Sequence, residues 1–134
     1  LTLGEEYAAV VRAARTERLL LVEAEARDLA FSHADIGRLL AERWNLPPMV
    51  AEVLQNHHRP AAAGAFRQEA AVVHLADIFS RAAGLGSGGD ALVPPLDPEA
   101  WDQLGLALED IEPLMRAMDA AFRDIRPFTA AAGA

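Results

Sequence analysis

Four histidines and one aspartate are the residues of this chain best suited to bind a divalent metal ion. The histidines are His33, His57, His58 and His74, and Asp77 follows His74 by about one helical turn. Neutral imidazole and carboxylate groups are suitable ligands for such an ion. A histidine on an apolar helix face, however, is more often a packed residue with one hydrogen bond. Each of the four histidines can therefore be interpreted either as a metal ligand or as a packed structural residue.

The spacing of these residues gives only a weak metal signal. His57 and His58 are neighbours, and neighbouring side chains on a helix diverge by ~100°. The pair could equally be a helix C-terminal cap favoured by the helix dipole. The chain contains neither an HExxH motif nor a His-Asp doublet.

Other kinds of catalytic site are excluded by residue type. The chain has no cysteine, which excludes disulfides, thiolate metal sites and thiol catalysis. It has no lysine, so the glycine-rich stretch at 84–89 is not a P-loop and is expected to be a linker. Neither Ser80 nor Ser87 lies in a GxSxG elbow.

The composition indicates one folded domain. The chain has 134 residues, of which 52% are apolar, so neither disorder nor a second large domain is expected. Its net charge of −8 disfavours binding to nucleic acid or to an anionic membrane. No apolar run approaches the ~18 residues of a membrane span, and a cytoplasmic location is expected.

Helical periodicity is present in every apolar segment, which predicts an all-α fold of six or seven helices. Thr2 and Glu5 have capping-box spacing, so a first helix begins there, with an apolar stripe of Leu3, Tyr7, Val10, Val11 and Ala14. A shorter helix is expected from about Leu20 to Leu29. Ser32 should open a third helix, whose buried face is expected to be Ile36, Gly37, Leu40 and Trp44, with His33 on the same face.

The second half of the chain is divided by prolines and glycines. Pro47 and Pro48 end the third helix and open a fourth, whose inner face is expected to be Val50, Val53, Leu54 and His57. A fifth helix is predicted at about 67–83, with Val72, Leu75, Phe79 and Ala82 on one face. The loop at 84–95 is expected to be the most mobile internal segment. Asp97 and Pro98 should start a short helix at 99–104, and Asp110 should cap the last helix, whose stripe is Ile111, Leu114, Met115, Met118, Phe122 and Ile125.

Five motifs follow one another along the chain: Glu25, Phe31 to Gly37, Trp44 to Pro47, His57 to Pro60, and His74 to Asp77. Their order resembles that of an HDOD domain, the HD-related output domain of bacterial signalling proteins. The resemblance covers roughly 5–125 and implies a helical bundle of the HD superfamily, related to HD-GYP phosphodiesterases. By that resemblance His33, His57, His58 and Asp77 form a residual metal-ligand set around one pocket, with weak divalent metal binding and no resident cofactor.

The chain departs from the family patterns at several positions. The His-Asp doublet and the Gly-Tyr-Pro signature of the phosphodiesterases are absent, and Arg59 and Pro60 occupy the place of the latter. The output-domain pattern usually has Asp at the position of Ser32 and Gly at that of Ala30. The first helices of the domain are also expected to be missing, which would expose an apolar face and favour a homodimer.

The sequence thus supports two main functional hypotheses, with a structural helical fragment as a third. The favoured hypothesis is a non-catalytic signal-transduction domain that contacts other signalling domains or proteins, with no catalytic residues. The alternative is a metal-dependent phosphohydrolase acting on a phosphodiester or cyclic dinucleotide. The expected domain comprises 1–128, and 129–134 is expected to be a frayed tail.

Overall fold

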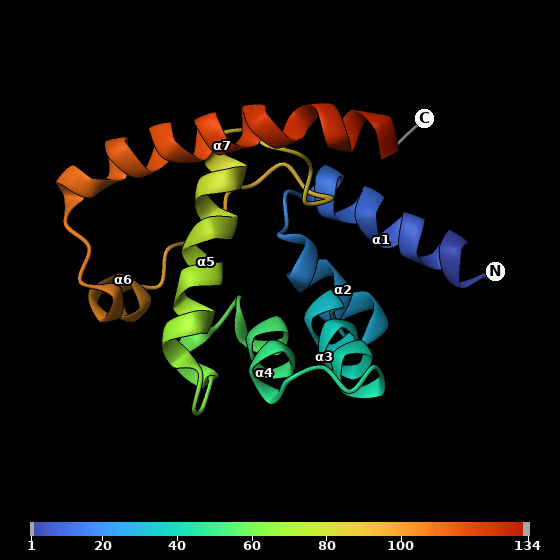
Figure 1. Ribbon diagram of the computed structural model, residues 1–134. Helices are drawn as coiled ribbons and strands as arrows, with labels where there is room; N and C mark the ends of the chain where they lie inside the picture. The colour runs from blue at the N-terminus through green and yellow to red at the C-terminus, as the bar shows by residue number, and fades with distance from the viewer. Residues whose placement is uncertain (1, 133–134) are drawn as a thin grey trace.

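The computed structural model describes residues 2–132 of the chain, and it is all-α over that range, as predicted (Figure 1). It contains seven α-helices and two short 3₁₀ turns, and no strand occurs among these residues. The helices are α1 (Leu3–Glu17), α2 (Leu21–Leu29), α3 (His33–Arg43), α4 (Pro48–Asn56), α5 (Arg67–Ala82), α6 (Pro98–Leu104) and α7 (Ile111–Ala132).

Local capping interactions set the predicted helix starts. The Thr2 hydroxyl accepts from the Glu5 backbone N–H while the Glu5 carboxylate accepts from the Thr2 N–H, which is the predicted capping box of α1. Ser32 and Asp35 form the same box at α3. The Asp97 carboxylate caps α6 by accepting from the Glu99 N–H.

The helices form two packed groups that meet at the candidate site. α1 and α2 share a small core of Val10, Ala14, Leu21 and Ala24. α3 and α4 form a hairpin, and α4 also packs against α5, which stands at the centre of the molecule (Figure 1). α7 crosses the C-terminal half of α5, where side chains of both helices line an apolar groove.

Alanine dominates the buried apolar residues. Nine of the thirteen buried apolar side chains in the described part of the chain are alanines. Small side chains let helix axes approach closely, and each buries little apolar area. A stripe of large apolar residues therefore does not mark the inner face of these helices.

The predicted buried face of α3 is wrong for this reason. Ile36 is 39% exposed and Trp44 is 65% exposed, and Leu40 is exposed as well. α3 instead buries Ala34 and Ala41, and the bare Gly37 backbone lies against the Leu54 side chain of α4. The inner face of α3 is therefore the face that carries these small residues, not the face with the large apolar side chains.

The inner faces predicted for α4 and α5 are partly wrong. In α4 the buried residue is Ala51, and Leu54 is exposed although it packs on Gly37. In α5 Leu75 is buried as predicted, but Val72 is 52% exposed. The buried stripe of α5 comprises Ala70, Ala71, His74, Leu75 and Ile78.

The glycine-rich loop after α5 is anchored to the rest of the fold. The buried Asp90 carboxylate accepts from the backbone N–H groups of Leu21 and Leu92, at 2.7 and 2.8 Å, and pairs with Arg81 of α5. Arg15 of α1 donates to the Gly89 carbonyl at 2.8 Å. The predicted mobility of this loop rests on a shortage of apolar anchors. These polar contacts hold it at Gly89 and Asp90, and its mobility stays a prediction.

The last helix begins after Asp110, as predicted, and continues to Ala132. It therefore extends past Phe128, where the sequence places the start of a tail. The side chains of Leu3 and Ile125, assigned to apolar stripes above, and residues 133–134 lie outside the described part. The domain limits 1–128 and 129–134 stay a prediction. Among residues 2–132, no helix has the length and apolar character needed to cross a bilayer.

Candidate functional site

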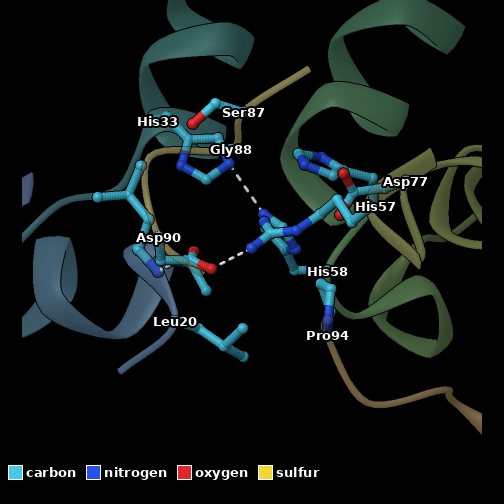
Figure 2. Close-up of a pocket in the computed structure, with 12 residues that line it drawn as sticks. Leu20, His33, His57, His58, Asp77, Ser87, Gly88, Asp90 and Pro94 are labelled. Atoms are coloured by element: carbon cyan, nitrogen blue, oxygen red, sulfur yellow. Dashed lines mark hydrogen bonds and ion pairs between the residues drawn. The ribbon is translucent and has the colours of Figure 1, made fainter. Parts of the chain in front are cut away.

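One cavity of about 240 Å³ is lined by all four residues of the predicted ligand set. His33, His57, His58 and Asp77 share it with residues of the start of α2 and of the loop after α5 (Figure 2). The ligand atoms of the three histidines lie within 4.8 Å of one another. That close group does not include Asp77, which lies on the cavity wall beside His57. We call His33, His57 and His58 the imidazole cluster.

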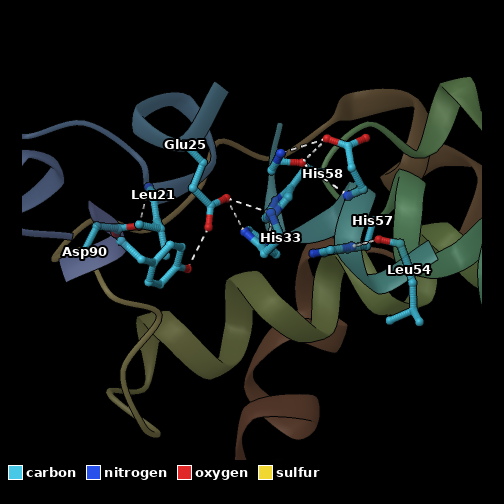
Figure 3. A network of polar contacts seen from close by, with 10 residues as sticks. Leu21, Glu25, His33, Leu54, His57, His58 and Asp90 are labelled. Atoms are coloured by element: carbon cyan, nitrogen blue, oxygen red, sulfur yellow. Dashed lines mark hydrogen bonds and ion pairs between the residues drawn. The ribbon is translucent and has the colours of Figure 1, made fainter. Parts of the chain in front are cut away.

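His33 is held by a buried carboxylate behind it. Glu25 of α2 is 1% exposed, and its Oε2 accepts from the His33 Nδ1–H at 2.6 Å and from the His33 backbone N–H at 2.9 Å. The other oxygen, Oε1, accepts from the Tyr7 hydroxyl of α1 at 2.7 Å. Figure 3 shows the carboxylate of Glu25 directed at the His33 ring. With its proton on Nδ1, the neutral His33 ring presents the Nε2 lone pair to the cavity.

The Tyr7 hydroxyl is hydrogen-bonded to the other oxygen of the same carboxylate. Burial and the contact with Glu25 raise the pKa of Tyr7 to about 12. The phenol is therefore a proton donor throughout the neutral range, and its hydrogen bond to Glu25 is fixed in direction.

His33 and His58 face each other through their Nε2 atoms, at 2.8 Å. Burial, reinforced by the neighbouring imidazoles, lowers the pKa of His58 to about 3, so this ring is neutral at pH 7. One of the two facing nitrogens must carry a proton and the other must accept it. When both rings are neutral and His33 holds its proton on Nδ1, His58 is the donor.

His57 presents a free lone pair to the same cavity. Its Nδ1–H donates to the Leu54 carbonyl at 2.8 Å, which leaves Nε2 unprotonated in the neutral ring. Burial lowers the pKa of His57 as well. The centroids of the His57 and His58 rings lie 4.0 Å apart in a tilted arrangement, so the two neighbours share one site although their side chains diverge.

His74, the fourth histidine, is a structural residue. It is buried, its Nδ1–H donates to the His57 carbonyl at 2.8 Å, and its Nε2 accepts from the Asp97 backbone N–H at 3.0 Å. A backbone N–H can only donate, so His74 is a neutral ring with both nitrogens engaged. It fixes the end of α4 and the start of α6 to α5, and it has no nitrogen left for a ligand.

The donor set of the cavity fits one divalent ion. The three imidazoles can bring one nitrogen each to within 4.8 Å of one another, and the Asp77 carboxylate lines the same cavity outside that close group. Imidazole and carboxylate are ligand types that Zn²⁺ accepts. Rings with lowered pKa values stay neutral, which metal binding requires. The metal role of His33, His57, His58 and Asp77 remains a prediction.

An ion pair between α5 and the following loop lines the same cavity as the imidazole cluster. The Arg81 guanidinium pairs with the buried Asp90 carboxylate and its Nε–H donates to the Leu92 carbonyl at 3.0 Å. A Cβ atom on Gly88 would lie 2.5 Å from Arg81 Nη1, so glycine at this position makes room for the guanidinium. The positive charge of Arg81 also disfavours protonation of His58.

Sequence reasoning assigned no role to Tyr7, Glu25, Arg81 or Asp90 in this site. Glu25 belongs to one of the motifs of the family resemblance, and its position four residues after the buried Leu21 places it on the inner side of α2. A charged residue on the inner face of a predicted helix can therefore indicate a functional site. The contacts of Tyr7 and Asp90 are tertiary, and no local pattern indicates them.

Two departures from the output-domain pattern have visible structural consequences. Ser32 caps α3 through its hydroxyl, a role that the more usual Asp can also perform. Ala30, at a position that usually has Gly, adopts φ +60° in the left-handed region at the end of α2. Glycine takes that conformation without steric cost, whereas alanine does not.

Comparison with known families agrees with the motif order. The family model of the HDOD domain matches residues 1–60. This stretch is thus similar to the HDOD domain. It spans α1 to α4 and contains Tyr7, Glu25 and the whole imidazole cluster.

The HDOD match confirms the resemblance over that stretch, and it ends before Asp77 and Arg81. These two residues enter the site through the fold, because α5 packs against α4. Searches of curated proteins and of solved structures find no match to the chain.

Proposed function

We propose that this chain is a non-catalytic output domain of a bacterial signalling protein, acting in the cytoplasm. It would pass the state of another domain to a protein partner through helix contacts. The HDOD match at residues 1–60 supports a signalling association and an HD-related domain. The net charge of −8 favours protein partners, including a second copy, over nucleic acid or membrane.

The engagement of the Glu25 carboxylate is the observation that carries the non-catalytic assignment. Glu25 is the buried carboxylate nearest the cluster, and its two oxygens accept three hydrogen bonds from Tyr7 and His33. Hydrolysis by a two-metal centre needs ligands for both ions and an open position for water. With Glu25 engaged, Asp77 is the one carboxylate on the cavity wall that is not already hydrogen-bonded within the described residues.

Exposed apolar side chains on α3 support contact with a partner. Ile36, Leu40 and Trp44 recur at four-residue steps and lie on one exposed face of the helix. Removing such side chains from water stabilises an association by ~25 cal/mol per Å² of apolar area. The α3 face lies on the helix that carries His33, so binding there would act on the helix that holds the cluster.

The second candidate function is a metal-dependent phosphohydrolase of the HD superfamily. It is favoured by the imidazole cluster, whose three ligand atoms lie within 4.8 Å. Under this hypothesis, His33, His57, His58 and Asp77 would bind an ion that polarises a phosphodiester and activates water.

The number of bound ions separates the proposed function from hydrolysis at a two-metal centre. The proposed function predicts at most one Mn²⁺ or Zn²⁺ per chain in a calorimetric titration, lost in His57→Ala. Two ions per chain, both lost in His57→Ala, would contradict the proposal and favour the hydrolase. Glu69→Gln, an exposed carboxylate on α5, is the control for non-specific metal binding.

A further inference from the structure

A chain of hydrogen bonds connects α1 to the imidazole cluster through Glu25. Tyr7 of α1 donates to Glu25 Oε1 at 2.7 Å, and Glu25 Oε2 accepts from His33 Nδ1–H at 2.6 Å. His33 Nε2 then contacts His58 Nε2 at 2.8 Å. The chain crosses from α1 to α2, to the first turn of α3 and to the end of α4 within four side chains.

The position of Glu25 decides which nitrogen of His33 faces the cluster. Both bonds from His33 go to the same carboxylate oxygen, one from the ring and one from the backbone N–H. This fixes the ring relative to the start of α3. A carboxylate hydrogen-bonded to one imidazole nitrogen sets the tautomer and orientation in which the other nitrogen can act as a ligand.

The hydrogen bond from Tyr7 to Glu25 is a directional contact between α1 and α2. The other contacts between α1 and α2 are the exposed ion pair of Arg27 with Glu17 and an apolar core of Val10, Ala14, Leu21 and Ala24. Such packing does not specify the position of a single hydroxyl, whereas the buried carboxylate of Glu25 does. The position of α1 and the orientation of His33 therefore depend on the same acceptor.

We propose that Tyr7 and Glu25 are positioning residues that hold His33 with Nε2 turned toward His57 and His58, and that they link the docking of α1 to divalent-cation binding at the cluster. The linkage goes beyond the proposed function, because it applies whether the bound ion serves a signal or a reaction. It is also reciprocal: if docking of α1 strengthens binding of the ion, then the ion strengthens docking of α1 by the same factor.

Zn²⁺ titrations of the full chain test the first half of the proposal. Loss of a group that orients a metal-binding histidine typically weakens the metal by ~10–100-fold. We expect Glu25→Leu to weaken Zn²⁺ binding within that range and Glu25→Gln to restore part of it, because the amide oxygen can still accept from His33. Tyr7→Phe keeps the ring and should weaken binding by a few fold, since one bond to Glu25 is lost. Glu6→Gln, an exposed carboxylate on α1, should leave it unchanged.

Two readouts distinguish positioning from simple structural support. The imidazole ¹⁵N shifts of His33 should show a protonated Nδ1 in the wild-type chain and a tautomer mixture in Glu25→Leu. Backbone amide exchange in α1 should slow when Zn²⁺ is added to the wild-type chain, and it should respond less in Tyr7→Phe. If Tyr7 and Glu25 only stabilise the fold, the His33 tautomer stays the same in Glu25→Leu, and Zn²⁺ slows exchange in α1 equally in Tyr7→Phe and in the wild-type chain.

The proposal is overturned if the wild-type chain binds no Zn²⁺, or if Tyr7→Phe and Glu25→Gln bind it as the wild type does. It is equally overturned if Zn²⁺ leaves amide exchange in α1 unchanged in the wild-type chain. If Glu25→Leu fails to fold by circular dichroism, Tyr7→Phe and Glu25→Gln decide the question, because both keep the buried volume. A failure here leaves the number of bound ions, and hence the test of the proposed function, unaffected.

Discussion

His33 Nε2 and His58 Nε2 lie 2.8 Å apart, in a contact that joins the first turn of α3 to the residue pair after α4. The two nitrogens satisfy each other, with one proton between them. The third ring, His57, keeps its Nε2 directed into the same cavity. The His57 Nε2 thus has no hydrogen-bond partner among the described residues, whereas the facing Nε2 atoms of His33 and His58 would have to part to bind an ion.

Acid should destabilise the fold through His58 and His57. The pKa of His58 is about 3 in the folded chain against an ordinary value of 6.5, and that of His57 is also lowered. The unfolded chain therefore binds more protons between these values. Stability is fully present above pH 6.5 and is lost progressively as the pH falls toward about 3.

Urea unfolding between pH 6.5 and about 5 tests this pH dependence. Asp35, whose pKa is lowered from 3.8 by hydrogen bonds from Ser32, contributes only at lower pH. We expect the free energy of unfolding to decrease across the window, and His58→Gln to decrease the slope. A flat profile, or an unchanged slope in the variant, would show that His58 is not held neutral by burial.

Ala30→Gly should stabilise the chain. Ala30 has φ +60°, and the left-handed conformation costs an L-residue ~1–2 kcal/mol that glycine does not incur. We expect the free energy of unfolding to rise by about 1 kcal/mol. The matched control is Ala8→Gly in the exposed side of α1, where glycine should cost about 1 kcal/mol. Loss of stability in both variants would rule out strain at Ala30.

Asp90→Ala should destabilise the chain far more than loss of a surface carboxylate. Asp90 is buried, and its removal leaves Arg81 without a paired negative charge and the Leu21 and Leu92 backbone N–H groups without their acceptor. Breaking a buried pair from one side costs ~3–5 kcal/mol.

Asp119→Ala, which breaks an exposed pair with Arg123 on α7, is the control for this substitution. It should cost about 0.5 kcal/mol or less. Urea unfolding of both variants compares them directly. Similar small losses would mean that Asp90 does not anchor the loop.

The isolated chain is expected to self-associate through the exposed face of α3. Trp44, at 65% exposed, should contribute most, and Trp44→Gln should shift light scattering at high micromolar concentration toward the monomer. Leu108→Gln, an exposed apolar residue far along the chain, should not. A monomeric wild-type chain at that concentration would contradict the expected homodimer.

Features that depend on a few neighbouring residues could be predicted from the sequence. The capping box of Thr2 and the helix starts at Ser32 and Asp97 follow from neighbouring residues alone, and the structure confirms them. The convergence of His33, His57 and His58 came from the order of family motifs, because no local spacing relates residues so far apart.

The buried faces could not be predicted from large apolar residues. Alanine supplies most of the core, and it occurs on both inner and outer faces, so it leaves no distinct pattern. Glu25 illustrates the same limit for the site. Its burial depends on Tyr7, which lies 18 residues earlier in the chain, and on the packing of α1 against α2.

Phosphodiester turnover with metal present tests most directly whether the imidazole cluster serves binding rather than hydrolysis. The chain, saturated with Mn²⁺, should be assayed on a generic phosphodiester and on a cyclic dinucleotide, beside His57→Ala and a protein-free Mn²⁺ blank. The account predicts the same rate for the wild-type chain, the variant and the blank. Turnover by the wild-type chain that disappears in His57→Ala would contradict it and establish the phosphohydrolase.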